Sequence, residues 1–182
     1  MHVVCSPVFI SGILQIIYLL KFFWWEIGYF GTIDVMHDRC GFYISWGCLS
    51  WVLSVYTFHT GILLSVKLHE SQSSNDFAAF TMDAMNALSV FAIGVLSIYI
   101  NYEADAQKIR VRRAKGKCNV FGKPAKIITA TYATKEGKNK KSILLVSGYW
   151  GWARHFHYIP ELMFALMICV PTKIASPLQL FY

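Results

Sequence analysis

The sequence is poor in charged residues, which make up 15% of its 182 residues, whereas hydrophobic residues make up 55%. A soluble domain of this size usually contains about 25% charged residues, so the shortage argues against an ordinary water-soluble fold. A disordered or collagen-like chain is excluded as well, because such chains lack the apolar residues that are abundant here.

Several motifs that would indicate a known site are missing. The five cysteines are an odd number without a CxxC pair, so neither a disulfide framework nor a zinc ribbon is indicated. There is no GxGxxG or GxxxxGK[ST] motif, which argues against a Rossmann or P-loop nucleotide site. We expect no metal site, because the adjacent His37 and Asp38 would not face one centre on a helix.

Acidic residues are almost absent from residues 108–141, which contain twelve lysines and arginines and one acid, Glu136, for a net charge of +11. The rest of the chain has five basic and nine acidic residues, a net charge of −4. One basic segment between apolar flanks indicates a membrane protein with a cytosolic loop, since Lys and Arg are retained on the cytoplasmic side. Nucleic acid is not expected as a partner.

Four apolar stretches are expected to lie in the membrane, at about residues 6–25, 42–66, 80–100 and 143–171. A signal peptide is the alternative for the first, but it lacks a basic n-region and a cleavage site. Glycine, histidine and Pro160 interrupt the last stretch, which predicts a re-entrant or interfacial piece and then a short helix from Glu161 to Val170.

The basic loop, residues 101–141, differs in pattern from the apolar stretches. KIITATY and SILLVSG are separated by the turn-rich KEGKNKK, which predicts a β-hairpin. The expected fold class is therefore an all-α membrane protein, a multi-spanning transmembrane helical bundle with a basic cytosolic loop that contains a hairpin.

One candidate chemical cluster lies between the first two apolar stretches, where Glu26, Asp34, His37 and Asp38 occur. On a helix, Asp34, His37 and Asp38 would share one face. Neighbouring carboxylates hold an imidazole in its charged form, which suits a proton donor. The alternative, which spacing alone favours, is a solvated loop with a local Asp–Arg pair.

A second candidate cluster combines the basic segment with SGYWGWARHFHYIPE. Lys108 and Arg112 are four residues apart and would project from one helix face. Cations with aromatic and imidazole side chains suit a ligand that has phosphates and planar rings. The alternative, again favoured by spacing alone, is an anchor on anionic lipid. The other members are Trp150, Arg154, His155, His157 and Tyr158.

Three long motifs occur in one order along the chain: FFWWEIGYFGTIDVMHDRCGFYISWGCLSWVLSVYT, INYEADAQKIRVRRAKGKCNVFGKPAKII and LLVSGYWGWARHFHYIPELM. Together they resemble the sterol reductase family, over about residues 22–66 and 98–170. ARHFHY resembles the Δ7-reductase branch, and HDRCGFY, WGC and HFHYIPE are most similar to its plant-type members.

The resemblance implies a multi-pass enzyme of the endoplasmic reticulum membrane that uses NADPH to reduce the ring-B Δ7 double bond of a 5,7-diene sterol. An unactivated alkene accepts hydride only after protonation, so an acid is needed as well. Candidates for the acid at family positions are Glu26, Asp34, His37, Asp38 and Tyr56. The positions that match the family's NADPH contacts are Lys108, Arg112, Leu145, Trp150, His157 and Tyr158, and Arg154 lies in the same motif.

The chain departs from the family in length, because it starts among the family's helices and stops before its C-terminal region. The resemblance therefore implies an incomplete reductase, and activity of the short chain alone is not implied. The expected partners are a sterol, membrane lipid and another membrane chain that supplies missing helices. The alternatives are a non-catalytic sterol-binding or scaffold protein of the same family, and a membrane anchor with a lipid-binding loop.

Overall fold

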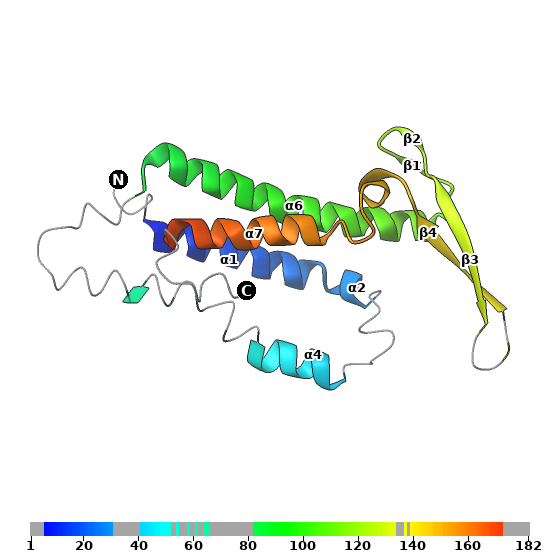
Figure 1. Ribbon diagram of the computed structural model, residues 1–182, viewed down its shortest axis with the longest axis horizontal. Coiled ribbons are helices and arrows are strands. Elements are labelled where there is room, and N and C mark those ends of the chain that lie inside the picture. The colour runs from blue at the N-terminus through cyan, green and yellow to red at the C-terminus, as the bar shows by residue number, and fades with distance from the viewer. Residues whose placement is uncertain are drawn as a thin grey trace, which may run out of the picture. The chain divides into compact units, whose positions relative to one another are not determined.

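The structure, a computed structural model, describes residues 6–30, 41–51, 54, 58, 61, 64–65, 82–133, 137 and 139–172. The chain divides into two compact units. The first consists of Met1–Ile98 with Glu161–Tyr182, and the second of Tyr99–Pro160. The described residues are mostly helical, with short strands in the second unit (Figure 1).

The first unit is built from helices. Its elements are α1 (Pro7–Trp24), α2 (Glu26–Tyr29), α4 (Phe42–Trp46), the π-helical η1 (Gly47–Trp51), the first part of α6 (Ala84–Arg113), most of α7 (Tyr158–Cys169) and η4 (Val170–Thr172). Pro7 stands at the first position of α1, where the missing N–H removes no hydrogen bond. Lys21 in the last turn of α1 complements the negative end of the helix dipole.

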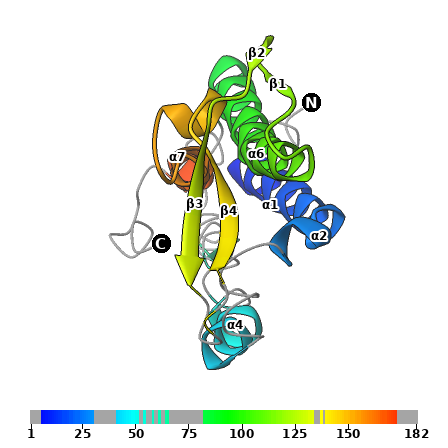
Figure 2. The same ribbon diagram turned by 90° about the vertical axis from the view of Figure 1, so that its right-hand side faces the viewer.

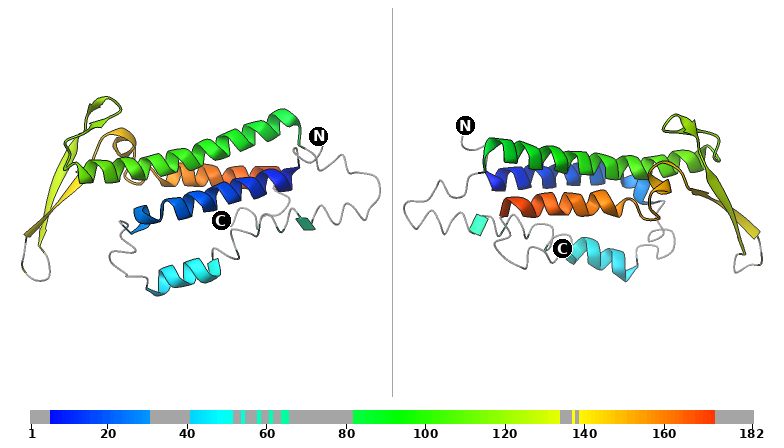
Figure 3. Two further views of the ribbon diagram at one scale, coloured as in Figure 1. Left: turned by 180° about the vertical axis from the view of Figure 1, so that it is seen from behind. Right: turned by 45° about the horizontal axis from the view of Figure 1, so that its top comes forward.

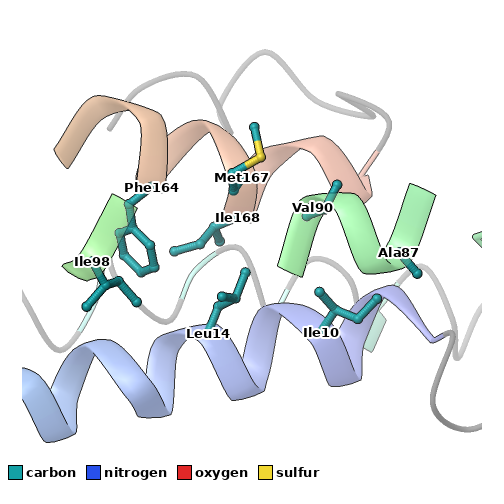
Figure 4. Packing of buried hydrophobic residues seen from close by; sticks show 8 residues of the cluster. All are labelled: Ile10, Leu14, Ala87, Val90, Ile98, Phe164, Met167 and Ile168. Atoms are coloured by element: carbon teal, nitrogen blue, oxygen red, sulfur yellow. The ribbon is translucent and has the colours of Figure 1, made fainter. Parts of the chain in front are cut away.

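The core of the first unit lies between α1, α6 and α7, which run side by side there (Figures 1 and 3). Leu14 of α1 and Phe164 of α7 are 0% and 1% exposed. The remaining core residues come from the same three helices (Figure 4); they are Ile10, Ala87, Val90, Ile98, Met167 and Ile168.

Two specific contacts accompany this apolar core. The Tyr18 hydroxyl of α1 donates a 2.6 Å hydrogen bond to Glu161 Oε1 of α7, and the Tyr18 ring stacks on Phe164 with centroids 4.7 Å apart. Gly94 of α6 lies against Leu14, so that a Cβ at position 94 would be 2.8 Å from a Leu14 methyl group. Glycine therefore allows α1 and α6 to approach closely, as small residues do between membrane helices.

Two described helices, α1 and α6, are long and apolar enough to cross a membrane. They correspond to the first and third expected apolar stretches. The second stretch, 42–66, begins with α4 and η1, and most of its remainder lies outside the described residues. In the fourth stretch the apolar helix α7 has 12 residues, which is shorter than the roughly 20 needed to span a bilayer.

Two element boundaries differ from those expected. Residues 101–113 continue α6 instead of opening the basic loop, because this segment lacks proline and glycine and is rich in good helix formers. Helix α7 begins at Tyr158, before the expected Glu161. Pro160 falls within its first turn, where the missing N–H breaks no intrahelical bond.

The second unit adds two small antiparallel pairs to the end of α6. Strand β1 (Asn119–Val120) pairs with β2 (Lys123–Pro124), and β3 (Ile127–Ala133) pairs with β4 (Asn139–Leu145) (Figure 2). The expected hairpin is thus observed, and the expected all-α class is corrected to mostly helical with strands. Helix α6 ends in a Schellman-type turn, in which Gly116 N–H donates to Val111 O and Gly116 has φ +80°.

The Gly94 contact generates a stability prediction. Gly94→Val should lower the free energy of unfolding by about 2 kcal/mol, because its methyl groups would displace the buried Leu14. The measurement is unfolding of the helices in mixed detergent micelles, followed by circular dichroism. Gly12→Val is the matched control, since a Cβ at Gly12 meets nothing within 4 Å, and it should change the free energy by no more than about 0.5 kcal/mol. Equal losses in both variants would contradict the proposed packing.

Candidate functional site

One face of α6 in the second unit holds the segment 148–157. Asn101, Ala104 and Gln107 are buried on this face, since residues three apart lie above one another on a helix. Asn101 Nδ2 donates to the His157 carbonyl at 3.0 Å, and Trp150 Nε1 donates to the Ala104 carbonyl at 2.8 Å. The backbone N–H of Tyr149 donates to Gln107 Oε1 at 3.1 Å. Three hydrogen bonds thus fix the segment to three successive positions of one helix face.

A glycine is required where this segment turns toward α6. Gly148 has φ +64° and opens the 3₁₀ turn η3 (Gly148–Gly151). A Cβ at this position would collide with the Gln107 side chain and with Val120 of β1. Both the left-handed backbone and the close approach therefore select glycine.

A cation of α6 meets aromatic side chains of the segment 148–157 and of the first residue of α7. The Lys108 ammonium lies 4.4 Å from the centroid of the Trp150 ring, within cation–π distance. It also forms a 3.1 Å ion pair with Asp105. The His157 ring lies 5.5 Å from the Trp150 ring and 4.2 Å from the Tyr158 ring. Lys108, Trp150, His157 and Tyr158, the lysine–aromatic row, are thus a continuous set of contacts.

A second set of aromatic contacts, centred on Tyr149, stabilises the segment 148–157. Tyr149 stacks on the buried Phe156 at 5.0 Å and meets Phe121 edge-on at 5.0 Å. Burial raises the pKa of Tyr149, and the Glu103 carboxylate raises it further. The phenol therefore stays neutral at physiological pH and serves as a packing group.

The lysine–aromatic row can bind an anionic ligand that has planar rings. Lys108 supplies a cation for a phosphate group, and the three rings supply stacking surfaces. Arg112 lies one turn further along α6 with an exposed side chain, whereas Arg110 is paired with Glu103 at 2.9 Å. This donor set suits a ligand that has phosphate groups and planar rings.

The structure brings together four of the six expected cofactor contacts, namely the members of the lysine–aromatic row. Arg112 is on the same helix as Lys108, and Leu145 ends β4 with intermediate exposure. Arg154 is exposed between η3 and α7. Of the expected acids, Glu26 is exposed at the start of α2; Asp34, His37, Asp38 and Tyr56 lie outside the described residues.

Three residues that position the segment 148–157 are not identified from the sequence. They are Asn101, Gln107 and Gly148, which hold or permit the contacts between α6 and residues 148–157. A signal was present, because Asn101, Ala104 and Gln107 follow an apolar run at intervals of three. Two amides and a small residue on one helix face indicate a polar surface to which another segment binds closely.

Comparison with known proteins identifies the family of the chain. Residues 2–182 match the Ergosterol biosynthesis ERG4/ERG24 family, and the chain belongs to this family. The resemblance expected from the sequence motifs is therefore confirmed.

Relatives of the chain are named as sterol reductases. It is 44% identical over 98% of its length to a 7-dehydrocholesterol reductase of Arabidopsis thaliana, and 33% identical over 98% to one of Xenopus laevis. A Delta(14)-sterol reductase of Methylotuvimicrobium alcaliphilum is 31% identical over 98% of the chain. The alignments cover 39%, 35% and 37% of these relatives, so the chain spans less than half of their length.

The turn at Gly148 generates a prediction about the segment 148–157. Gly148→Ala should destabilise its attachment to α6 by about 3 kcal/mol, because left-handed strain adds to a collision with Gln107. The measurement is the rate of tryptic cleavage after the exposed Arg154, which should rise at least about tenfold.

Gly122→Ala is the matched control for that prediction. Gly122 also has a positive φ, +75°, but a Cβ there meets nothing within 4 Å. Gly122→Ala should therefore cause only backbone strain at the β1–β2 turn. Cleavage after Arg154 should stay near the wild-type rate. Equal acceleration in both variants would show that the contact with Gln107 does not hold the segment.

Proposed function

We propose that the chain is part of an NADPH-dependent sterol Δ7-reductase that reduces the ring-B double bond of a 5,7-diene sterol. The observation that carries the proposal is the Lys108 ammonium 4.4 Å from the Trp150 ring, on a segment fixed to α6 by three hydrogen bonds. The Δ7 specificity is supported by the higher identity to the Arabidopsis 7-dehydrocholesterol reductase, 44%, than to the bacterial Delta(14)-sterol reductase, 31%.

The proposed roles in cofactor binding follow from side-chain chemistry. Lys108 and Arg112 would bind the phosphates. Trp150, His157 and Tyr158 would stack against the rings, and Leu145 would supply an apolar contact. When bound, NADPH supplies the hydride.

The reaction also requires a proton. A proton adds to one carbon of the alkene and the hydride to the other, so that the double bond becomes a single bond and the reduced nicotinamide is oxidised. Glu26 is proposed as an acid on the described part of the chain, where its exposed carboxyl opens α2. The other proposed acids, Asp34, His37, Asp38 and Tyr56, are retained from the sequence resemblance.

The proposed location is the endoplasmic reticulum membrane, with several passes. Support comes from α1 and α6, which are long and apolar enough to cross a bilayer. The excess of positive charge in residues 108–141 would place that segment on the cytosolic side. The proposed partners are a sterol, membrane lipid and a further membrane chain that supplies helices present in the longer relatives.

Two measurements test the proposed function. The chain is expressed in microsomes of a host without Δ7-reductase, and conversion of 7-dehydrocholesterol is followed with and without NADPH. Binding of NADPH is titrated spectroscopically. Trp150→Ala and Lys108→Ala should each weaken NADPH binding about tenfold, because each removes one partner of a cation–π contact in a site that binds phosphate.

Trp152→Ala is the control, since Trp152 is 86% exposed and lies outside the lysine–aromatic row. It should leave NADPH binding unchanged. NADPH binding without sterol conversion would contradict catalysis by the chain alone. Sterol binding without NADPH binding would instead favour a non-catalytic sterol-binding or scaffold role. Loss of binding in Trp152→Ala equal to that in Trp150→Ala would refute the assigned site.

A further inference from the structure

The β3–β4 hairpin presents an apolar face that the reductase proposal does not use. Ile128 pairs directly with Leu144, and Val146 continues the ladder by donating its N–H to the Lys126 carbonyl. Side chains at paired positions and at every second residue share one face of a hairpin. Ile128, Leu144 and Val146 are therefore neighbours on this face, and they are 54%, 45% and 38% exposed.

Charged and amphipathic residues flank these three aliphatic side chains on the same face. The register places Lys126 beside Val146, and it pairs Tyr132 with Lys140 further along the hairpin. Both lysines are exposed, and Tyr132 is 51% exposed. The outer hairpin face, as defined by Lys126, Ile128, Tyr132, Lys140, Leu144 and Val146, therefore has its aliphatic side chains beside Lys126 at one end and Tyr132 with Lys140 at the other, with the pair Ala130–Ser142 between them.

The opposite face of the hairpin is partly covered by its own unit at the end near α6. Ile127 lies against Gly116 in the turn that ends α6, where a Cβ on the glycine would meet the Ile127 side chain. Ile127, Ile143 and Leu145 on this opposite face are each less exposed than Ile128 and Leu144. The hairpin thus packs part of one face on its own unit, near Ile127, and leaves the aliphatic residues Ile128 and Leu144 of the other face exposed.

We propose that the outer hairpin face docks on the surface of a membrane that contains anionic lipid. Aliphatic side chains insert among the acyl chains near the headgroups, tyrosine lies at the headgroup level and lysines pair with lipid phosphates. Charge complementarity selects this occupant, because residues 108–141 carry twelve basic residues and one acid. The chain also supplies helices long enough to cross a bilayer, which would keep the hairpin near its surface.

Amide hydrogen exchange of the hairpin measures this docking. A two-stranded hairpin is marginally stable alone, so its exchange rate responds to any surface that stabilises it. The full chain is placed in nanodiscs of phosphatidylcholine with or without about 30% phosphatidylserine. Exchange in residues 127–145 should be at least about fivefold slower in the anionic discs, and the difference should disappear in about 1 M salt.

Paired variants separate the outer face from general charge. Lys126→Gln with Lys140→Gln should abolish most of the slowing, because each lysine near an anionic surface contributes about fivefold to binding. Lys117→Gln with Lys123→Gln removes the same charge from exposed lysines outside this face. This pair should preserve most of the slowing of exchange in anionic discs. Leu144→Ser should also weaken the effect, whereas Thr131→Ser on the opposite face should not.

Two results would overturn the proposal. Equal exchange in neutral and anionic discs would show that lipid charge does not hold the hairpin. Equally slow exchange in detergent and in both kinds of disc would show that protein covers the face instead. Neither result depends on NADPH binding or on sterol conversion, so failure of the docking proposal is distinguishable from failure of the reductase proposal.

Discussion

The site of the second unit depends on one face of α6, to which the segment 148–157 is held by hydrogen bonds. Asn101, Ala104 and Gln107 offer an amide donor, a carbonyl and an amide acceptor at successive turns. The partners come from a segment with little regular structure, which would otherwise be free to take many conformations. A rigid helix thereby orders a loop at the places where the loop carries its aromatic side chains.

The first unit shows how three apolar helices pack when hydrophobicity alone does not select a partner. In a bilayer, lipid tails are as apolar as leucine, so shape and polar contacts determine which helix faces meet. Gly94 provides the shape by admitting Leu14. The Tyr18–Glu161 hydrogen bond provides a polar contact that only one alignment of α1 and α7 satisfies.

Prediction from the sequence succeeded where the signal was local. The apolar run of α1 and the alternating strands around KEGKNKK follow from hydropathy and turn composition, and both were observed. The basic loop expected from residue 101 instead continues α6 to Arg113, because charged and polar residues form helices well. The helical spacing of Lys108 and Arg112 is consistent with this extension. The same local reasoning could not reveal that Gln107 meets Tyr149, because 42 positions separate them. The family motifs located Lys108 and Trp150, whereas most of the proposed acids lie outside the described residues.

Lys108 already has a counter-ion of its own, since Asp105 lies one turn before it on α6. An anion that binds this ammonium therefore shares it with Asp105, whose carboxylate already compensates part of its charge. This compensation makes anion binding weaker than at an uncompensated lysine. It also provides a partner for the lysine when the anion departs, which favours turnover of a charged ligand over its retention.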